Sequence, residues 1–511
     1  MNKTNLLIKD SFWALGAGVV LGAILSVFSA GSIWLGWLKC GVLSALLIFG
    51  LIRVWRLVGA GRTLAIVMLV SFIIRIGFGI FLNQGLPLWG FDNPVQNTGY
   101  VFSDAHNRDQ AAFQIAVSGE VWWTQIKAAG AADQYGGLLT LSTLTYWVFS
   151  SDVHRPLLMV LFSAAAMAAG VAFLFAVVNR KWGGKMALIA AWIYAIYPDS
   201  ILLGSSQMRE PILIGLTCLL LWNVLEWKKK PIHSLVSTLI TTVVICLISI
   251  PAAGAAFTMV FGLVFFEWLK DQSKIKTRRV GFFVFAAFLI LAGVAGWIWL
   301  KQSLSYEYYI TQSGSGWIAA LLEQYGTQYQ IPFITFYGLT QPLLPAALVD
   351  DSLPIWKSIA IFRAAGWYFI IPFLVYGFVA VFKSRKEENR SILIFISIAL
   401  AAWILISSVR AGGDQWDNPR YRATFLPWIA ILASWVWMRV RQQKSHWFWR
   451  IVLFEAIFIL VFLDWYLYRY FNFGLLIAFP TLVLILVCSA FLILVGGFFL
   501  DKKITGKKTG D

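Results

Sequence analysis

Three short stretches of the sequence concentrate the charged and polar side chains that could act on a substrate. They are Ser103-Asp104-Ala105-His106-Asn107-Arg108-Asp109, then Arg209-Glu210-Pro211, and finally Arg420-Tyr421-Arg422. A carboxylate can take a proton from an attacking hydroxyl, and arginine forks bind phosphate or pyrophosphate oxygens. Together the three stretches indicate chemistry or binding at a phosphorylated ligand.

Each cluster also has a purely structural explanation. Asp104 suits the N-cap of an interfacial helix, and Glu210 before Pro211 suits the positive end of a helix. Arginines near Arg420 fit a basic belt at the end of a membrane span. That belt, however, falls on the side of the membrane that the charge rule disfavours, so its arginines need an anionic partner there.

A divalent cation such as Mg or Mn is a further possibility. His106 could join Asp104 and Glu210 in an oxygen-rich site, although hard cations need several converging oxygens. A lone loop histidine is more often a polar surface residue, and the ligand set is left as unknown with these three candidates. The other histidines stand alone in the sequence and are interpreted as interfacial: His154, His233 and His446.

The composition places these clusters in a membrane protein. Of the 511 residues, 59% are hydrophobic and 13% are charged, which exceeds what a soluble fold of this length could bury. The net charge of +17 comes from short basic clusters between apolar runs, a pattern that sets membrane orientation and argues against nucleic-acid binding. The four cysteines lie singly in apolar runs, which indicates neither disulfides nor zinc.

Apolar runs long enough for a bilayer of about 30 Å predict an all-α integral membrane protein with about 14 transmembrane helices. The predicted spans are residues 12–30, 33–52, 63–82, 156–178, 186–203, 211–227, 232–250, 252–269, 280–300, 364–382, 391–408, 423–438, 448–466 and 474–499.

The basic residues predict the orientation of these spans. With the N-terminus in the cytoplasm, 28 of the 41 Lys and Arg residues fall on that side, and both termini are cytoplasmic. We therefore expect a multi-pass protein of the inner cell membrane. The outer side holds 15 of the 24 acids and all three polar clusters, so the candidate active site is extracytoplasmic.

Two long outer segments complete the predicted organisation. Residues 137–150 are apolar but would cover only about 21 Å as a helix, so they are predicted to be interfacial or re-entrant. The aromatic-rich second outer segment suits interfacial helices. The predicted parts are an N-terminal transmembrane hairpin (1–60), a catalytic core (61–300) with outer loop 83–155, an outer interfacial segment (301–363) and C-terminal transmembrane helices (364–511).

Taken in order, these motifs resemble the C-type (GT-C) integral-membrane glycosyltransferases, in particular the protein-mannosyltransferase and aminoarabinose-transferase-like group, which use polyprenyl-phosphate sugars. The residues that carry the likeness are Asp104 in its polar stretch, Gln134-Tyr135-Gly136-Gly137-Leu138, Ile193 to Pro198 with Arg209-Glu210 after it, and Arg420-Tyr421. The chain departs from the family in three respects. It has three predicted spans before the loop in place of one, Gly136-Gly137 in place of Pro-Pro, and Glu210 in place of Asp.

The resemblance implies a GT-C-like fold and an inverting transfer of a sugar from a polyprenyl-phosphate donor to a hydroxyl of a lipid, glycan or protein acceptor. It implies that Asp104 is the general base and that Glu210 orients the acceptor or a cation. Substrate contacts would come from Arg108, Asp109, Tyr135, Arg209, Arg420, Tyr421 and Arg422. Two alternatives remain, a flippase or transporter for a lipid-linked saccharide and a polysaccharide polymerase or ligase with a lipid-diphosphate donor.

Overall fold

The computed structural model describes residues 3–59, 61–119, 121, 136–272, 274–314, 323, 326–412 and 414–507. Within them the chain is helical and contains no β-strand. Eleven of the described helices are long and apolar enough to cross a membrane, or up to 13 spans if each of two bent pairs counts as one. The prediction of an all-α multi-pass membrane protein is confirmed. The predicted span at 211–227 corresponds to helix α11 (Glu210–Glu226). Its 17 residues rise only about 26 Å, less than a bilayer core of about 30 Å, and α11 is not among the eleven candidate spans.

The chain divides into two compact units, the first formed by Met1–Ser303 with Arg420–Ile431 and the second by Leu304–Pro419 with Leu432–Asp511. The helices of the first unit begin with α1 (Lys3–Val27), α2 (Ile33–Leu57), α3 (Arg62–Trp89), α4 (Pro94–Asn97), α5 (Ser103–Val117), α7 (Gly137–Phe149) and α8 (Leu157–Trp182). They continue with α9 (Gly184–Ile196), α10 (Pro198–Gly204), α11, α12 (Pro231–Ile248), α13 (Ile250–Asp271) and most of α14 (Ile275–Gly314).

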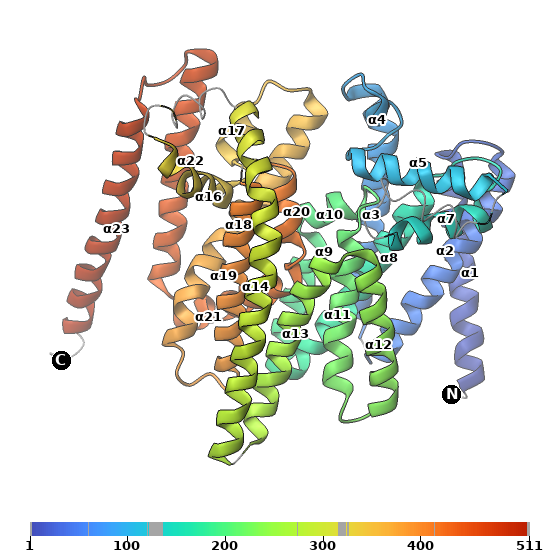
Figure 1. Ribbon diagram of the computed structural model, residues 1–511, viewed down its shortest axis with the longest axis horizontal. Helices are drawn as coiled ribbons and strands as arrows, with labels where there is room; N and C mark the ends of the chain where they lie inside the picture. The colour runs from blue at the N-terminus through green and yellow to red at the C-terminus, as the bar shows by residue number, and fades with distance from the viewer. Residues whose placement is uncertain are drawn as a thin grey trace. The chain divides into compact units, whose positions relative to one another are not determined.

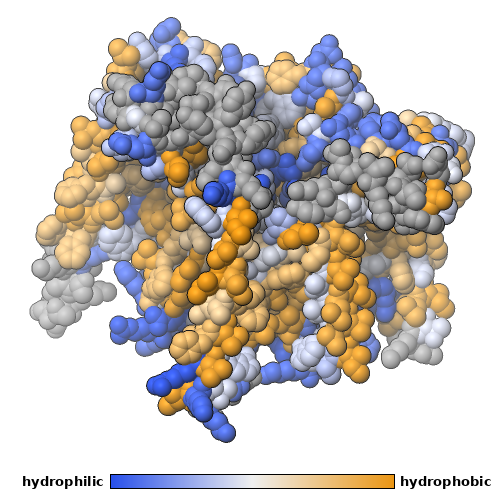
Figure 2. Space-filling view, in the orientation of Figure 1, coloured by the Kyte–Doolittle hydropathy of each residue, from blue (hydrophilic) through white to orange (hydrophobic). Residues whose placement is uncertain are grey.

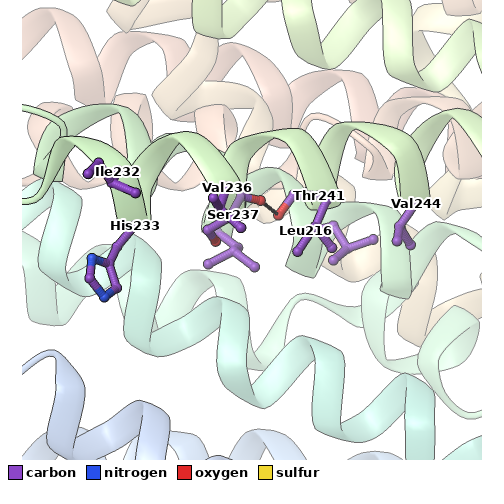
Figure 3. Close-up of a pocket in the computed structure, with 9 residues that line it drawn as sticks. Leu216, Ile232, His233, Val236, Ser237, Thr241 and Val244 are labelled. Atoms are coloured by element: carbon purple, nitrogen blue, oxygen red, sulfur yellow. Dashed lines mark hydrogen bonds between the residues drawn. The ribbon is translucent and has the colours of Figure 1, made fainter.

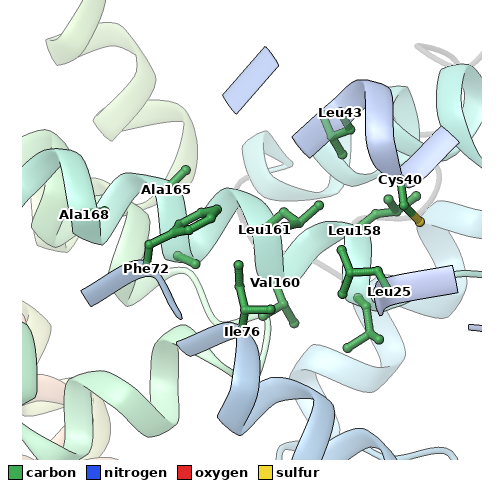
Figure 4. Close-up of a cluster of buried hydrophobic side chains, with 12 residues drawn as sticks. Leu25, Cys40, Leu43, Phe72, Ile76, Leu158, Val160, Leu161, Ala165 and Ala168 are labelled. Carbon is green, nitrogen blue, oxygen red and sulfur yellow. The ribbon is translucent and has the colours of Figure 1, made fainter. Parts of the chain in front are cut away.

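Helix α8 is the centre of the first unit, and the N-terminal hairpin of α1 and α2 packs against it. A buried cluster brings Leu25 of α1, Cys40 of α2 and Phe72 of α3 onto Leu158 and Leu161 of α8 (Figure 4). These side chains come from four helices and interdigitate as in a soluble core. The hairpin is thus an integral part of the first unit.

Small residues let α1 and α2 approach closely. A Cβ atom added at Gly22 would lie 2.5 Å from the Cα of Gly41, which is backbone and cannot move aside. In lipid, the hydrophobic effect does not drive helices together. Small residues at a helix crossing instead allow the two backbones to approach and to form close van der Waals contacts.

We therefore expect Gly22→Leu to separate the hairpin and to lower the free energy of unfolding by about 1–3 kcal/mol. The measurement is the thermal midpoint of the purified protein in detergent. Gly16→Leu in the same helix is the matched control, because a Cβ there meets nothing within 4 Å. Equal midpoints for the two variants would contradict the proposed role of the close approach.

A buried arginine stabilises a bend between α9 and α10. The two helices meet at an angle of 53° where Pro198 interrupts the backbone hydrogen bonds. The carbonyl of Ala195 accepts a hydrogen bond from Arg75 Nη1 at 3.0 Å, and Ser200 Oγ accepts one from Nη2 at 2.9 Å. Arg75, which lies inside predicted span 63–82, thus pairs within the protein, as an intramembrane charge should.

Within the first unit, the polar segment that contains α5 and α7 lies at one end of the predicted spans. Helices α5 and α7 run across the end opposite to the α11–α12 and α13–α14 turns (Figure 1). Hydrophobic residues cover the middle of α12, α13 and α14, and hydrophilic residues gather at the turn between α13 and α14 (Figure 2). The predicted interfacial or re-entrant helix at 137–150 is α7 (Gly137–Phe149), 13 residues long.

The second unit contains the remaining helices. They are the end of α14, η1 (Thr327–Tyr329), α16 (Gln330–Thr340), α17 (Leu344–Val349), α18 (Pro354–Lys383), α19 (Arg390–Ala411), most of α21 (Leu426–Gln443), α22 (His446–Phe471) and α23 (Phe479–Lys507). Two helices extend into the predicted outer segment 301–363, since α14 continues to Gly314 and α18 begins at Pro354. Pro354 favours this early start because a proline fits the first turn of a helix.

Candidate active site

The candidate site forms around Arg420 in the first unit. This residue belongs to α20 (Asp417–Ala423), a short helix that meets α21 at a bend of 70°. Pro427 lies in the first turn of α21, where its missing N–H costs no hydrogen bond. The sequence predicted a span at 423–438 directly after the arginines, and in the structure α21 begins at Leu426, with Arg420 and Arg422 in the separate helix α20.

The guanidinium of Arg420 joins two carboxylates. Its Nη2 donates to Asp104 Oδ2 at 3.1 Å and to Glu210 Oε1 at 3.1 Å, and its Nε donates to Glu210 Oε1 at 3.3 Å. These partners stand 316 and 210 residues from Arg420 in the sequence. The guanidinium also lies over the ring of Phe102, 5.4 Å from its centroid. The three predicted polar clusters therefore each contribute one residue to the same group of contacts.

The two carboxylates differ in their access to solvent. The side chain of Asp104 is 50% exposed, whereas that of Glu210 is 4% exposed. Both belong to the first turn of a helix, α5 and α11 respectively, where the helix dipole stabilises negative charge. The N-cap position of α5 is occupied by Phe102, so the explanation of Asp104 as a cap is wrong. Asp104 is placed to meet an incoming group, and Glu210 is placed to hold Arg420.

The two carboxylate oxygens of Glu210 differ in their hydrogen bonds. Oε1 accepts from Arg420 and lies 3.8 Å from Arg209 Nε, which makes Arg209 part of the same charge cluster. Oε2 is buried and accepts no hydrogen bond from the described residues. Leaving a buried carboxylate oxygen without a donor costs free energy, so the position of Glu210 depends on its contact with Arg420.

Arg108 lies one helical turn beyond Asp104 on α5 but has different surroundings. It is 5% exposed, and its Nη2 donates to the backbone carbonyl of Gln207 in the loop between α10 and α11. Its Nε is buried and has no partner among the described residues. The contact ties α5 to the loop that precedes Glu210, which helps to align the two acids of the site.

Asp109 is enclosed by three side chains and is 1% exposed. Tyr100 donates to Oδ2 at 2.6 Å, Tyr146 donates to Oδ1 at 2.7 Å, and His154 Nε2 lies 2.9 Å from Oδ2. Burial and the charge of Asp109 hold the pKa of Tyr100 well above its usual value, so the phenol keeps its proton as a donor. Asp109, predicted to contact substrate, is buried in this conformation, and its two carboxylate oxygens face Tyr100, Tyr146 and His154. Asp109 positions α5.

We expect Asp109→Asn to lower the free energy of unfolding by about 1–3 kcal/mol, because the amide leaves buried donors without an acceptor. Thermal unfolding of the purified protein measures this loss. Tyr146→Phe, which removes one donor of the network, is expected to cost less. Asp92→Asn, at an exposed acid of the same outer loop, is the control for loss of charge. An Asp109→Asn protein as stable as the control would refute the positioning role.

The remaining predicted site residues differ in accessibility. Arg422, predicted to contact substrate, is fully buried in this conformation. Tyr421 is half-buried, and its backbone carbonyl accepts from Thr424 Oγ1 at 2.6 Å. Tyr135 lies outside the described residues.

The candidate metal ligands do not gather into a site. In the described part of the chain, no group of three or more His, Cys, Asp and Glu side chains is arranged to hold a metal ion. Asp104 and Glu210 are bridged by Arg420, while the ring of His106 packs against that of Tyr100 with centroids 5.1 Å apart. The three candidates Asp104, His106 and Glu210 therefore do not converge as a ligand set in this conformation. His154, predicted to be isolated, is instead a partner of Asp109.

Sequence reasoning found the two carboxylates and the arginine between them but missed what aligns them. The partners of Asp109 lie 9, 37 and 45 residues away, and Gln207 lies 99 residues from Arg108. No spacing rule links such residues. The one available signal was that Tyr100 and His154 both flank predicted outer-loop helices.

Comparisons with known proteins give distant similarity. No protein-family model and no curated protein matches the chain. Among solved structures it is similar to the archaeal oligosaccharyltransferase AglB from Archaeoglobus fulgidus in complex with an inhibitory peptide and a dolichol-phosphate, with 11% identity and a TM-score of 0.35. The match covers 84% of this chain and 55% of that one, so this chain spans little more than half of its length. This degree of similarity assigns neither a family nor a function.

Proposed function

We propose that the protein is an inverting membrane glycosyltransferase, which moves a sugar from a polyprenyl-phosphate donor to an acceptor hydroxyl on the extracytoplasmic face. The observation that carries the proposal is the shared guanidinium of Arg420, which brings together Asp104 and Glu210. These residues belong to the three motifs on which the resemblance to the GT-C glycosyltransferases rests. An exposed carboxylate can act as the base for the acceptor hydroxyl, and an adjacent arginine can stabilise the charge on the leaving phosphate.

In the proposed reaction Asp104 accepts the proton of the acceptor hydroxyl. The acceptor oxygen forms a bond to the anomeric carbon as the bond between that carbon and the phosphate oxygen breaks. The electron pair of the broken bond stays on the phosphate, whose negative charge grows as it leaves. Arg420 stabilises that charge.

Binding of the donor would also free the base. In the structure, Arg420 Nη2 is shared between Asp104 and Glu210. The bond to exposed Asp104 is weakened by solvent, while the bond to buried Glu210 is not. A donor phosphate that takes the place of Asp104 at Nη2 leaves that carboxylate free to accept the proton of the acceptor hydroxyl. Glu210 meanwhile keeps Arg420 in place.

Two features support an extracytoplasmic site. Helix α5, which carries Asp104, lies at the end of the first unit away from the α11–α12 and α13–α14 turns (Figure 1). Lys228 to Lys230 lie in the first turn, and five basic residues between 270 and 279 lie in or beside the second; such clusters favour the cytoplasmic side.

The test is the identity of the lipid product. Purified protein in detergent is given polyprenyl-monophosphate and polyprenyl-diphosphate sugars in separate reactions, and the released lipid is identified by mass spectrometry. We expect release of polyprenyl monophosphate from the first donor. Turnover of the diphosphate donor alone would instead identify a polymerase or ligase. Movement of intact donor across proteoliposomes, without bond cleavage, would identify a flippase.

A further inference from the structure

A membrane-facing groove lies between α11 and α12, away from the candidate active site. Its volume is about 480 Å³, within the range of small-molecule sites, and its walls are mainly aliphatic. Leu216 and Leu219 of α11 form one wall, and Val236, Ile240 and Val244 of α12 belong to the other. Val236 and Ile240 are exposed, so in a bilayer the groove opens toward the lipid.

The groove has one polar end. His233 stands there and Val244 stands at the opposite end, with the residues between them following α12 (Figure 3). The turn before α12 carries Lys228, Lys229 and Lys230, all exposed. Glu226, the last residue of α11, pairs with Arg180 at 3.2 Å and with Lys229 at 3.5 Å. Three consecutive exposed lysines in the turn before His233 make this end of the groove basic.

The length of the groove matches one leaflet of a bilayer. From Ile232 to Val244 the helix rises about 18 Å at about 1.5 Å per residue. One leaflet of a hydrocarbon core of about 30 Å is about 15 Å deep. A chain that fills the groove would thus reach from the headgroup level almost to the bilayer midplane.

From this we propose that the groove binds one anionic phospholipid of the leaflet next to the basic turns. One acyl chain lies along α12 between the aliphatic walls, and the phosphate lies at His233 and the lysines of the α11–α12 turn. Basic pockets between transmembrane helices recognise acidic headgroups in this way, through charge at the surface and shape below it. The groove shares helix α11 with Glu210, but none of its lining residues belongs to the candidate active site.

The experiment measures lipid retention. The protein is reconstituted into nanodiscs of equal parts phosphatidylglycerol and phosphatidylcholine, re-extracted in mild detergent, and examined by native mass spectrometry. The wild type is expected to retain phosphatidylglycerol in preference to phosphatidylcholine. Replacing Lys228, Lys229 and Lys230 together by glutamine is expected to lower retention at least tenfold, since each lysine near an anionic headgroup contributes about fivefold in affinity.

Two further variants separate a built site from general attraction. Val236→Trp fills the groove without changing charge and is expected to abolish retention. The matched control replaces Lys274, Lys276 and Arg278 by glutamine in the exposed α13–α14 turn and is expected to retain the lipid. Equal loss of phosphatidylglycerol in both triple variants would show that surface charge alone holds the lipid. Normal retention by Val236→Trp would show that the lipid does not lie in the groove. Either result overturns the proposal.

The wild-type protein supplies a readout that survives a folding defect in any variant. Retention of phosphatidylglycerol is expected to fall as the salt concentration rises, because the headgroup contacts are exposed to screening ions. Retention of both phospholipids to the same extent at every salt concentration would also overturn the proposal.

Discussion

Asp104→Asn is expected to lower sugar transfer by at least about a hundredfold, with an unchanged amount of folded protein in the membrane. Asparagine keeps the size of the side chain and can still accept a hydrogen bond from Arg420, but it cannot take the proton of the acceptor hydroxyl. General-base assistance typically contributes about 10²- to 10⁴-fold to a rate. The loss should therefore appear in kcat more than in donor binding.

The measurement is the initial rate of transfer from a polyprenyl-phosphate sugar by purified protein, with binding of the donor followed separately. Asp92→Asn is the matched control, since it removes an exposed acid from the same outer loop. If Asp104→Asn transfers sugar at the rate of the control, Asp104 is not the general base. An equal loss in both variants would point to the overall charge of the outer face.

Arg420→Lys is expected to lower kcat/KM by about 10²- to 10³-fold, the usual cost of removing one preorganised charge donor from a developing anion. Lysine keeps the positive charge but cannot reproduce the planar fork that reaches Asp104 and Glu210 together. If Arg420 acts only on structure, the variant should be destabilised while its remaining folded fraction stays fully active.

A double-mutant cycle distinguishes these roles. Asp104→Asn combined with Arg420→Lys should lose much less activity than the product of the two single losses, because residues that act in one catalytic unit are not additive. Fully additive losses would show that the two side chains work independently. Wild-type kcat/KM for Arg420→Lys at an unchanged thermal midpoint would contradict the assigned role of the guanidinium.

The positions of most helices follow from local sequence, because an apolar run of sufficient length forms a helix in a membrane whatever it packs against. The span predicted at 391–408 is α19 (Arg390–Ala411), and the short apolar run at 137–150 is α7. Errors arise where helices extend beyond their apolar centres. The polar residues after 300 continue α14, and Lys357 and Arg363 lie inside α18.

Packing decided the places where a helix breaks and where a charge is buried. The turn at Tyr197-Pro198 is visible in the sequence as a proline, but the pairing of Arg75 with Ala195 across the bend is not, because the two residues are 120 positions apart. Likewise, Asp104 and Arg108 share a helical spacing that predicts one common face. One is half exposed and the other buried, because only Arg108 lies against the loop that carries Gln207.

The sequence alone determined that this chain is a membrane protein, where its apolar helices lie, and which carboxylates and arginines are candidates for chemistry. These properties depend on composition and on neighbours within a few turns. Tertiary structure decided that Asp104 and Glu210 share Arg420, that Asp109 is a buried support, and that Arg422 is enclosed. Such contacts join residues up to 316 positions apart, and their energies depend on distance and burial, which spacing along a chain does not encode.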